Sequence, residues 1–286
     1  VVFPDADLDS AADAITFGVY FNAGECCNSG SRIIVHEDVA EEFTQKFVAK
    51  LEALKPLRGT DPESTLGPIV DEGARDDIDQ LVQDAVAAGG EVLTGGHKIE
   101  GDGYFYAPTA IKVEKGNPIL QQEIFGPVAP IVTFSSEEEA IEMANDTEYG
   151  LAGYVSGADI DEVRRIGSQI RAGSISLNGA QVDPVAPFGG YKKSGNGREW
   201  GDYAFDEFLE VKSLLIGEAA TPENVAAVRA ALEGTDGVES VIHLRTMHLG
   251  PEEILVAAKI EVSSAETAAD VAAEIDAAEA AVRAAV

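Results

Sequence analysis

The chain has 286 residues, of which 45% are hydrophobic and 25% are charged, a composition typical of globular proteins. Acidic residues outnumber basic residues by 51 to 20, and a net charge of −31 argues against nucleic acid or an anionic membrane as a partner. No apolar run is long enough to span a bilayer. The two cysteines are adjacent and cannot form a disulfide framework, so we expect a reducing, cytoplasmic setting without a signal peptide.

The first three quarters of the chain alternate between helix-like and strand-like segments. Helices are predicted over 7–21, 38–54, 71–88, 137–145 and 159–170. Strands are predicted over 31–35, 91–94, 128–134, 151–156 and 173–178. Strands that alternate with helices of this length predict an α/β fold with a parallel sheet that is covered on its faces.

The remaining part of the chain has a different composition. All aromatic residues lie before residue 209, and residues 217–286 contain none. We therefore predict a domain boundary near 217–221, with one domain over 1–216 and a second over 217–286. In the second domain, helices from 221 and 264 flank strands over 238–248 and 253–262. This order predicts a small α+β (α-β-β-α) domain with one bare sheet face.

The two cysteines lie in a segment suited to a reactive thiol. Residues 20–32 read YFNAGECCNSGSR, which places Cys26 and Cys27 in a glycine-flanked loop after a helix. Two small buried hydrophobic residues would be the usual interpretation of an isolated cysteine pair. A loop on a rigid scaffold is, however, a common position for a nucleophile, and a thiol with a pKa of about 8.5 needs a base or positive electrostatics to react.

Two further segments carry candidate site residues. Residues 123–128 read EIFGPV, in which Glu123 taken alone would be a solvated loop residue. Residues 187–199 read PFGGYKKSGNGRE, which invites a phosphate-loop interpretation. A phosphate loop has a Gly-Lys-Ser or Gly-Lys-Thr sequence, whereas Lys193 precedes Ser194 without following a glycine. The chain also has no GxGxxG fingerprint of a dinucleotide-binding domain.

These three segments occur in the order found in the aldehyde dehydrogenase superfamily. Together with the opening VVFPDADLDSA, they make residues 1–216 resemble the catalytic half of such an enzyme. The resemblance implies that Cys27 attacks an aldehyde, and that Glu123 binds the nicotinamide-ribose hydroxyls of NAD or NADP. It also implies that Phe125 packs beside the nicotinamide ring and that Phe21 and Phe188 line the aldehyde tunnel. For Phe21 and Phe188, a plain core position is a nearly equal alternative.

The resemblance also implies catalytic and cofactor-binding parts of the enzyme that residues 1–216 do not contain. The family's general-base glutamate, its oxyanion asparagine and its dinucleotide-binding domain lie upstream of the matching segment. A general base contributes about 10²–10⁴-fold in rate, and one oxyanion donor about 10²–10³-fold. We therefore expect the isolated chain to keep a nucleophilic thiol without measurable NAD(P)-dependent oxidation.

Two segments suggest self-association. Residues 209–216, LEVKSLLI, resemble the family's edge strand that joins a partner subunit's sheet, which implies a homo-oligomer. The segment from about 220 to 286, in which residues 241–262 read VIHLRTMHLGPEEILVAAKIEV, resembles the cytoplasmic domain of cation diffusion facilitator transporters, which dimerises. His243 and His248 lie on opposite faces of the predicted strand and no cysteine accompanies them, so we predict no metal site.

The expected function is that of an aldehyde dehydrogenase, which oxidises an aldehyde to a carboxylic acid through a cysteine-bound thioester. The alternative is a non-catalytic dimerisation or scaffold protein, or a fusion with a transporter regulatory domain. The sequence does not identify the aldehyde.

Overall fold

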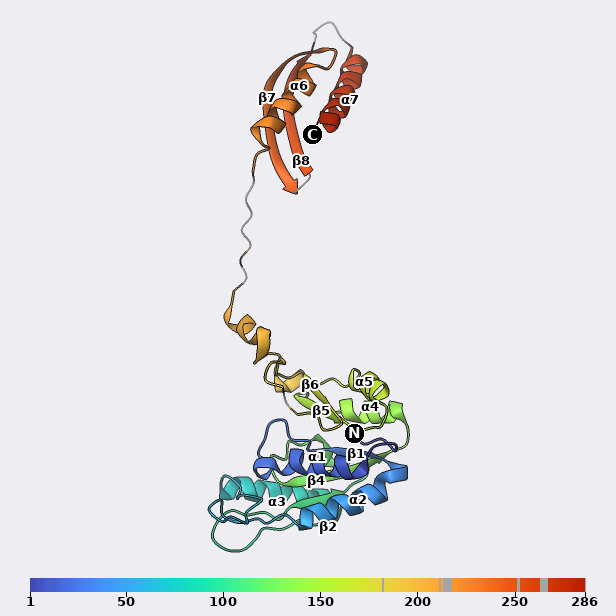
Figure 1. Cartoon of the computed structure of the whole chain (residues 1–286), viewed down its shortest axis with the longest axis vertical. Coiled ribbons are helices and arrows are strands. Elements are labelled where there is room, and N and C mark those ends of the chain that lie inside the picture. Colours follow the sequence, from blue (N-terminus) through green and yellow to red (C-terminus); the bar gives the residue numbers. More distant parts are fainter. Residues whose placement is uncertain (182, 211, 213–217, 251–252, 263–266, 286) are drawn as a thin grey trace. The chain divides into compact units, whose positions relative to one another are not determined.

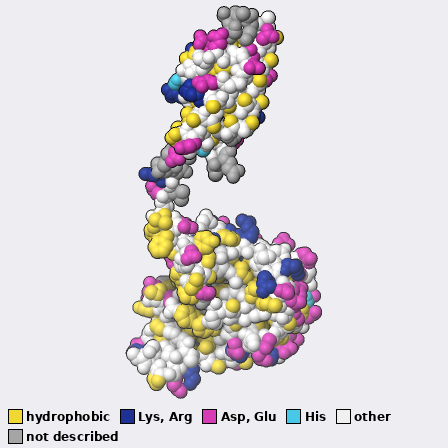
Figure 2. Space-filling view, turned by 45° about the horizontal axis from the view of Figure 1, so that its top comes forward, with side chains coloured by type: hydrophobic (Ala, Val, Ile, Leu, Met, Phe, Trp, Pro, Cys, Tyr) yellow, Lys and Arg dark blue, Asp and Glu magenta, His cyan; other side chains and the backbone are white. Residues whose placement is uncertain are grey.

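The computed structural model describes residues 1–181, 183–210, 212, 218–250, 253–262 and 267–285. The chain forms two compact units, Val1–Glu210 and Val211–Val286 (Figure 1). Acidic side chains are spread over the visible surface of each unit rather than gathered in one place (Figure 2). None of the helices in the described residues has the length and apolar character needed to cross a bilayer.

The first unit is built from helices and short strands that largely follow the predicted segments. Its helices are α1 (Leu8–Tyr20), α2 (Glu37–Glu52), α3 (Glu72–Ala87), α4 (Glu137–Asn145) and α5 (Ile160–Gly167). Its strands are β1 (Ile33–His36), β2 (Glu91–Thr94), β3 (Thr109–Lys112), β4 (Val128–Phe134), β5 (Ala152–Val155) and β6 (Ser174–Leu177). Short 3₁₀ segments are η1 (Phe21–Gly24), η2 (Pro118–Gln121), η3 (Lys192–Ser194) and η4 (Gly201–Phe208).

The expected α/β fold with parallel pairing is confirmed, but the main sheet is mixed because one of its edge strands is antiparallel. Its order is β1-β4-β3-β2, with β1 and β3 parallel to β4. Strand β2 pairs antiparallel with β3, a strand that the sequence did not predict. Residues 95–108, which connect them, contain no helix, and a helix is the usual crossover between parallel neighbours. A second, two-stranded sheet pairs β5 and β6 in parallel.

Val2 joins these two sheets. It forms parallel bridges both to Val35 in β1 and to Ser156 beside β5. Its backbone nitrogen donates to the carbonyl of Ile34 at 2.8 Å, and Phe3 N donates to Ser156 O at 3.0 Å. Val2 is fully buried, so a single short stretch of extended chain holds β1 and β5 side by side.

Helix caps and a continuous apolar core fix the elements around the site. The Asp7 side chain accepts from two backbone N–H groups at the start of α1, which satisfies donors that have no partner within the helix. The buried faces of α1 and α2 meet the sheet, where Tyr20, Phe43 and Phe47 form an aromatic group. The hydroxyl of Tyr20 donates to Thr109 O at 2.6 Å, which ties the end of α1 to β3.

The described part of the second unit contains α6 (Pro222–Glu233), β7 (Val238–Gly250), β8 (Glu253–Val262) and α7 (Ala268–Ala285). Strands β7 and β8 pair antiparallel, and both helices contribute to a small core that includes Val228, Leu232 and Ala278. The opposite face of the sheet carries exposed Met247, Leu249 and Leu255. The expected strand over 209–216 falls mainly on 211 and 213–216, which lie outside the described residues.

Candidate active site

The loop that carries the cysteines begins where α1 stops. Asn22, Ala23 and Gly24 all have positive φ angles, of 51°, 58° and 77°. Two consecutive non-glycine residues in this region are unusual, and such backbone strain persists only where surrounding contacts enforce it. One of these contacts is local, because the Asn22 side-chain amide donates to the carbonyl of Glu25 at 3.0 Å. These residues end α1 and lead into the turn that carries Cys26 and Cys27.

The two cysteines have different surroundings. Cys27 is exposed, whereas Cys26 is half-buried and its thiol donates to the Asn28 side-chain oxygen at 3.0 Å. The hydroxyl of Tyr154, from β5, donates to Asn28 O at 2.6 Å and fixes the backbone that follows the pair. Burial raises the pKa of Tyr154, and the negative charges of Cys26 and Cys27 as thiolates raise it further. The structure thus leaves Cys27 as the accessible thiol.

The cysteine loop is in direct backbone contact with the segment that contains Glu123. A Cβ atom on Gly24 would lie 2.1 Å from the carbonyl oxygen of Gly126, so only glycine fits there. A Cβ on Gly126 would lie 2.4 Å from Ile78 of α3. Glu25 ties the cysteine loop to another part of the unit, because its carboxylate accepts from Val70 N at 3.0 Å. The close approach of Gly24 and Gly126 thus holds the cysteine loop against the segment that contains Glu123.

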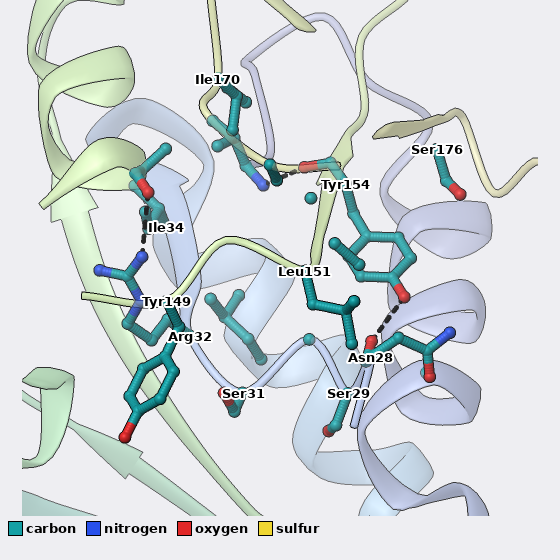
Figure 3. Close-up of a pocket in the computed structure, with 18 of the residues that line it drawn as sticks. Asn28, Ser29, Ser31, Arg32, Ile34, Tyr149, Leu151, Tyr154, Ile170 and Ser176 are labelled. Atoms are coloured by element: carbon teal, nitrogen blue, oxygen red, sulfur yellow. Dashed lines mark hydrogen bonds between the residues drawn. The ribbon is translucent and has the colours of Figure 1, made fainter. Parts of the chain in front are cut away.

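Cys27 and Glu123 line one cavity of about 200 Å³. Figure 3 shows other residues that line it, among them Asn28 and Tyr154. Residues from the loop after Cys27, from α1 and from β5 also line this cavity. Glu123 is exposed, so its carboxylate is free to accept hydrogen bonds from a ligand. Among the predicted site residues, these two are the ones that the structure brings to the same cavity.

The three predicted aromatic residues occupy separate positions. Phe125 follows Glu123 with a φ of 49° and is 46% exposed. Phe21 directly follows α1, is 54% exposed and stacks at a tilt on Phe17, with 5.4 Å between the ring centroids. Phe188 is half-buried and stacks on Trp200 at 4.9 Å. None of the three is among the described residues that line the cavity, so their roles stay predictions.

The glycine- and lysine-rich segment over 187–199 performs a structural task. Lys192 donates to the carbonyls of Asn145 and Thr147, just after α4. Burial lowers the pKa of Lys192, and the nearby positive charges of Arg171 and Arg32 lower it further. An ammonium held by two carbonyls at a helix C-terminus compensates the partial negative charge at that end of the helix.

Arg32 caps the same helix end from the cysteine segment. Its guanidinium donates to the carbonyls of Met143, Ala144 and Asp146 at 3.0–3.1 Å. Burial lowers the pKa of Arg32, while the charge of Asp146 opposes that change. Two of the three sequence segments, the one that carries Cys27 and the one over 187–199, thus meet at the end of α4.

Sequence reasoning missed Tyr154 and the contact between Gly24 and Gly126. Tyr154 lies in a predicted strand with no polar motif around it, so no local pattern indicated its hydrogen bond to the cysteine loop. The two glycines lie within the motifs, but their contact joins positions about a hundred residues apart and depends on the sheet. No group of three or more His, Cys, Asp or Glu suited to a metal ion occurs in the described ranges.

Comparison with known proteins places these features in a family. The model of the aldehyde dehydrogenase family matches residues 1–214. The chain is 46% identical over 220 residues to a succinate-semialdehyde dehydrogenase of Paenarthrobacter nicotinovorans, covering 76% of this chain and 49% of that protein. The chain thus spans about half the length of the curated relatives it matches.

Solved structures give the same result. An NAD-dependent aldehyde dehydrogenase from Sinorhizobium meliloti matches with a TM-score of 0.73 and 37% identity, over 75% of this chain and 43% of that one. Betaine aldehyde dehydrogenase from Staphylococcus aureus, in complex with NAD⁺, matches with a TM-score of 0.70 and 36% identity, over 73% and 43%. The matching family model and the shared α/β fold together show that this chain belongs to the aldehyde dehydrogenase family.

Proposed function

We propose that residues 1–210 supply the nucleophilic part of an NAD(P)-dependent aldehyde dehydrogenase, with Cys27 as the attacking residue. The observation that carries this proposal is the exposed Cys27 thiol, presented by a strained loop on the cavity that Glu123 also lines. The chain spans about half the length of the relatives it matches. We therefore propose the oxidation of aldehyde to carboxylic acid for an enzyme of which residues 1–210 form the part that carries the nucleophile.

The chemistry at Cys27 follows from the nucleophilicity of a thiolate. The Cys27 sulfur adds to the carbonyl carbon of the aldehyde, and the carbonyl oxygen takes the negative charge. Loss of a hydride from that carbon restores the carbonyl as a thioester on Cys27. Water then attacks the thioester, which releases a carboxylic acid and returns the thiol.

Glu123 and Phe125 are the residues here that would hold the nicotinamide end of the cofactor. A carboxylate accepts bonds from two ribose hydroxyls well, and an exposed aromatic ring offers a face to a planar heterocycle. When bound, NAD(P)⁺ supplies the hydride acceptor. The exposure of both side chains fits this role.

Succinic semialdehyde is the first aldehyde to test, because the relative that is 46% identical carries it in its name. The experiment measures NADH formation by the whole protein with succinic semialdehyde, betaine aldehyde and acetaldehyde. Cys27→Ala should abolish turnover, whereas Cys26→Ala should retain it, since Cys26 is half-buried and bonded to Asn28. Turnover that survives Cys27→Ala would refute the proposal.

A second candidate function concerns the second unit, for which we propose self-association through the open face of β7 and β8. Exposed Met247, Leu249 and Leu255 favour it, because apolar side chains on an uncovered sheet face gain from burial. The side chain of His243 accepts from Arg245 and pairs across the sheet with Lys259, surroundings that disfavour a metal cation. Pairing of residues 209–216 with a partner subunit's sheet stays a prediction. The relation of the second unit to the transporter domain also stays a prediction.

Light scattering of the chain with and without residues 218–286 tests the second candidate. A halved mass on removal of these residues supports association through the second unit. An unchanged mass contradicts it.

A further inference from the structure

The open face of β7 and β8 carries its side chains in a definite order along the strands. The covered face is marked by Leu244 and Val256, which pack against the core of the second unit. Because side chains alternate along a strand, the residues on either side of these two lie on the open face. They pair across the strands in successive rows, which are His243 with Lys259, Arg245 with Ala257, and Met247 with Leu255. Exposed Leu249 and Glu253 lie beyond the last of these rows.

The open face also carries the cations of this unit that have no acidic partner. Residues 217–286 contain 13 acidic and 4 basic residues, and two of the basic residues, Arg245 and Lys259, lie on the open face. The other two, Arg229 and Arg283, pair with glutamates on their own helices. Among the described residues, no carboxylate forms an ion pair with Arg245 or Lys259. This face is therefore the part of an acidic unit that a surface with carboxylates can approach without repulsion.

Two copies of the open face can pack about a twofold axis in two ways. An axis along the strands would place each row on the same row of the other copy, and would set Lys259 and His243 against their own counterparts. An axis across the strands reverses the strands of the other copy. If that axis passes through the row of Met247 and Leu255, the row of Arg245 meets the end of the sheet that carries Glu253. Charge complementarity favours the second arrangement, because like charges that face each other across an interface are costly.

We propose that two copies of the second unit pack open face to open face, with reversed strands and a twofold axis at the row of Met247 and Leu255. Arg245 of each copy then pairs with Glu253 of the other. Packed sheets lie about 10 Å apart, a gap that an arginine and a facing glutamate side chain bridge together. The interface has an apolar centre and a charged rim, as stable interfaces do. This inference rests on the self-association proposed above and adds its orientation and its ion pairs.

Cross-linking at introduced cysteines tests the orientation. Met247→Cys and Ile242→Cys are each made in the whole chain with Cys26→Ala and Cys27→Ala, so that a short bismaleimide reacts at one position. Both positions are exposed, at 42% and 55%. Position 247 lies at the axis and should cross-link two copies in high yield. Position 242 lies about 16 Å further along the strand, so its two copies are about 30 Å apart and should not cross-link. Equal yields at both positions, or none at position 247, would overturn the proposal.

A charge swap tests the pairing of Arg245 with Glu253. Arg245→Glu sets carboxylates against each other and should raise the dissociation constant of the whole chain, measured by sedimentation equilibrium, by about tenfold or more. Adding Glu253→Arg restores opposite charges and should return the constant to within about threefold of the parent value. Arg283→Glu makes the same change of charge on α7, where the side chain is 82% exposed, and is the matched control. This control should leave the dissociation constant unchanged.

The outcomes separate the orientation from the self-association itself. If removal of residues 218–286 lowers the mass but the second substitution does not restore what Arg245→Glu loses, the units associate in another orientation and this inference alone fails. An equal effect of Arg283→Glu would likewise show that net charge, rather than the ion pair, controls the association. If removal of residues 218–286 leaves the mass unchanged, the self-association and its orientation both fall.

Discussion

Gly24 and Gly126 meet backbone to backbone, so that a Cβ on Gly24 would lie 2.1 Å from the carbonyl oxygen of Gly126. Gly24 belongs to the loop that presents Cys27, and Gly126 to the loop that presents Glu123. The backbones of the two loops therefore approach more closely at these two glycines than a side chain would allow. The contact explains why both candidate functional segments carry a glycine at that point.

Replacing Gly24 with alanine should therefore disturb both loops. Gly24→Ala introduces the clash and places alanine at a φ of 77°, which should cost about 1–3 kcal/mol of unfolding free energy. Thermal unfolding followed by circular dichroism measures the loss, and iodoacetamide labelling should show altered reactivity at Cys27. Gly67→Ala, where a Cβ meets nothing within 4 Å, is the matched control. Equal stability of both variants would contradict the proposed lock.

Tyr154 should hold the nucleophile loop through a single hydrogen bond. Tyr154→Phe keeps the ring but removes the donor to Asn28 O, so we expect a loss of about 0.5–1.5 kcal/mol and a changed rate of Cys27 alkylation. Tyr149→Phe changes a ring that lines the same cavity and is the control. An alkylation rate that is unaffected by Tyr154→Phe would show that Asn28 is positioned by other contacts.

Acid stability should depend in part on Glu139. The hydrogen bond from Lys115 lowers the pKa of Glu139 to about 2, with help from the backbone and hydroxyl of Ser135. Because this pKa lies below the ordinary value of 4.5, the contribution is complete above pH 4.5 and is lost as pH falls towards 2. The fall in Tm over this interval should be shallower in Glu139→Gln than in the parent chain.

Glu142→Gln removes the same charge from the same helix, outside the contacts with Lys115 and Ser135, and serves as the control. If the parent, Glu139→Gln and Glu142→Gln lose Tm in parallel between pH 4.5 and 2, Glu139 does not carry the effect.

The second unit should unfold without affecting the first. Leu232 is 6% exposed in the core between α6 and β7, so Leu232→Ala should cost about 2–5 kcal/mol in that unit. Calorimetry should show a lower transition for the second unit, with labelling of Cys27 unchanged. Ala226→Ser, at an exposed position of α6, should leave both transitions in place. A matching shift of both transitions in Leu232→Ala would show that the units are coupled.

The sequence predicted elements best where periodicity was strong. The bounds of β2, β4 and α4 match the predicted ranges, because apolar runs and an N-cap at Ser136 mark their ends. Strand β3 was missed because its first three residues are all buried although they include Thr109, so its sequence shows neither alternation nor a continuous apolar run. The antiparallel pairing of β2 could have been predicted from the helix-free connection over 95–108.

The site was predictable in part for a related reason. Cys27 and Glu123 lie in compact motifs, and the structure brings them to one cavity. Tyr154 and the bridges of Val2 depend on pairing between distant segments, which no local pattern records. The fold had to be known before these residues could be placed at the site.

Acyl transfer to the thiol tests the central claim most directly, because it needs no cofactor. The chain is mixed with p-nitrophenyl acetate, nitrophenolate release is followed, and the acetylated residue is identified by peptide mass spectrometry. We predict a burst with the acetyl group on Cys27, which is retained in Cys26→Ala and absent from Cys27→Ala. Acetylation of Cys26 instead, or an unchanged burst in Cys27→Ala, would contradict the assignment of Cys27 as the nucleophile.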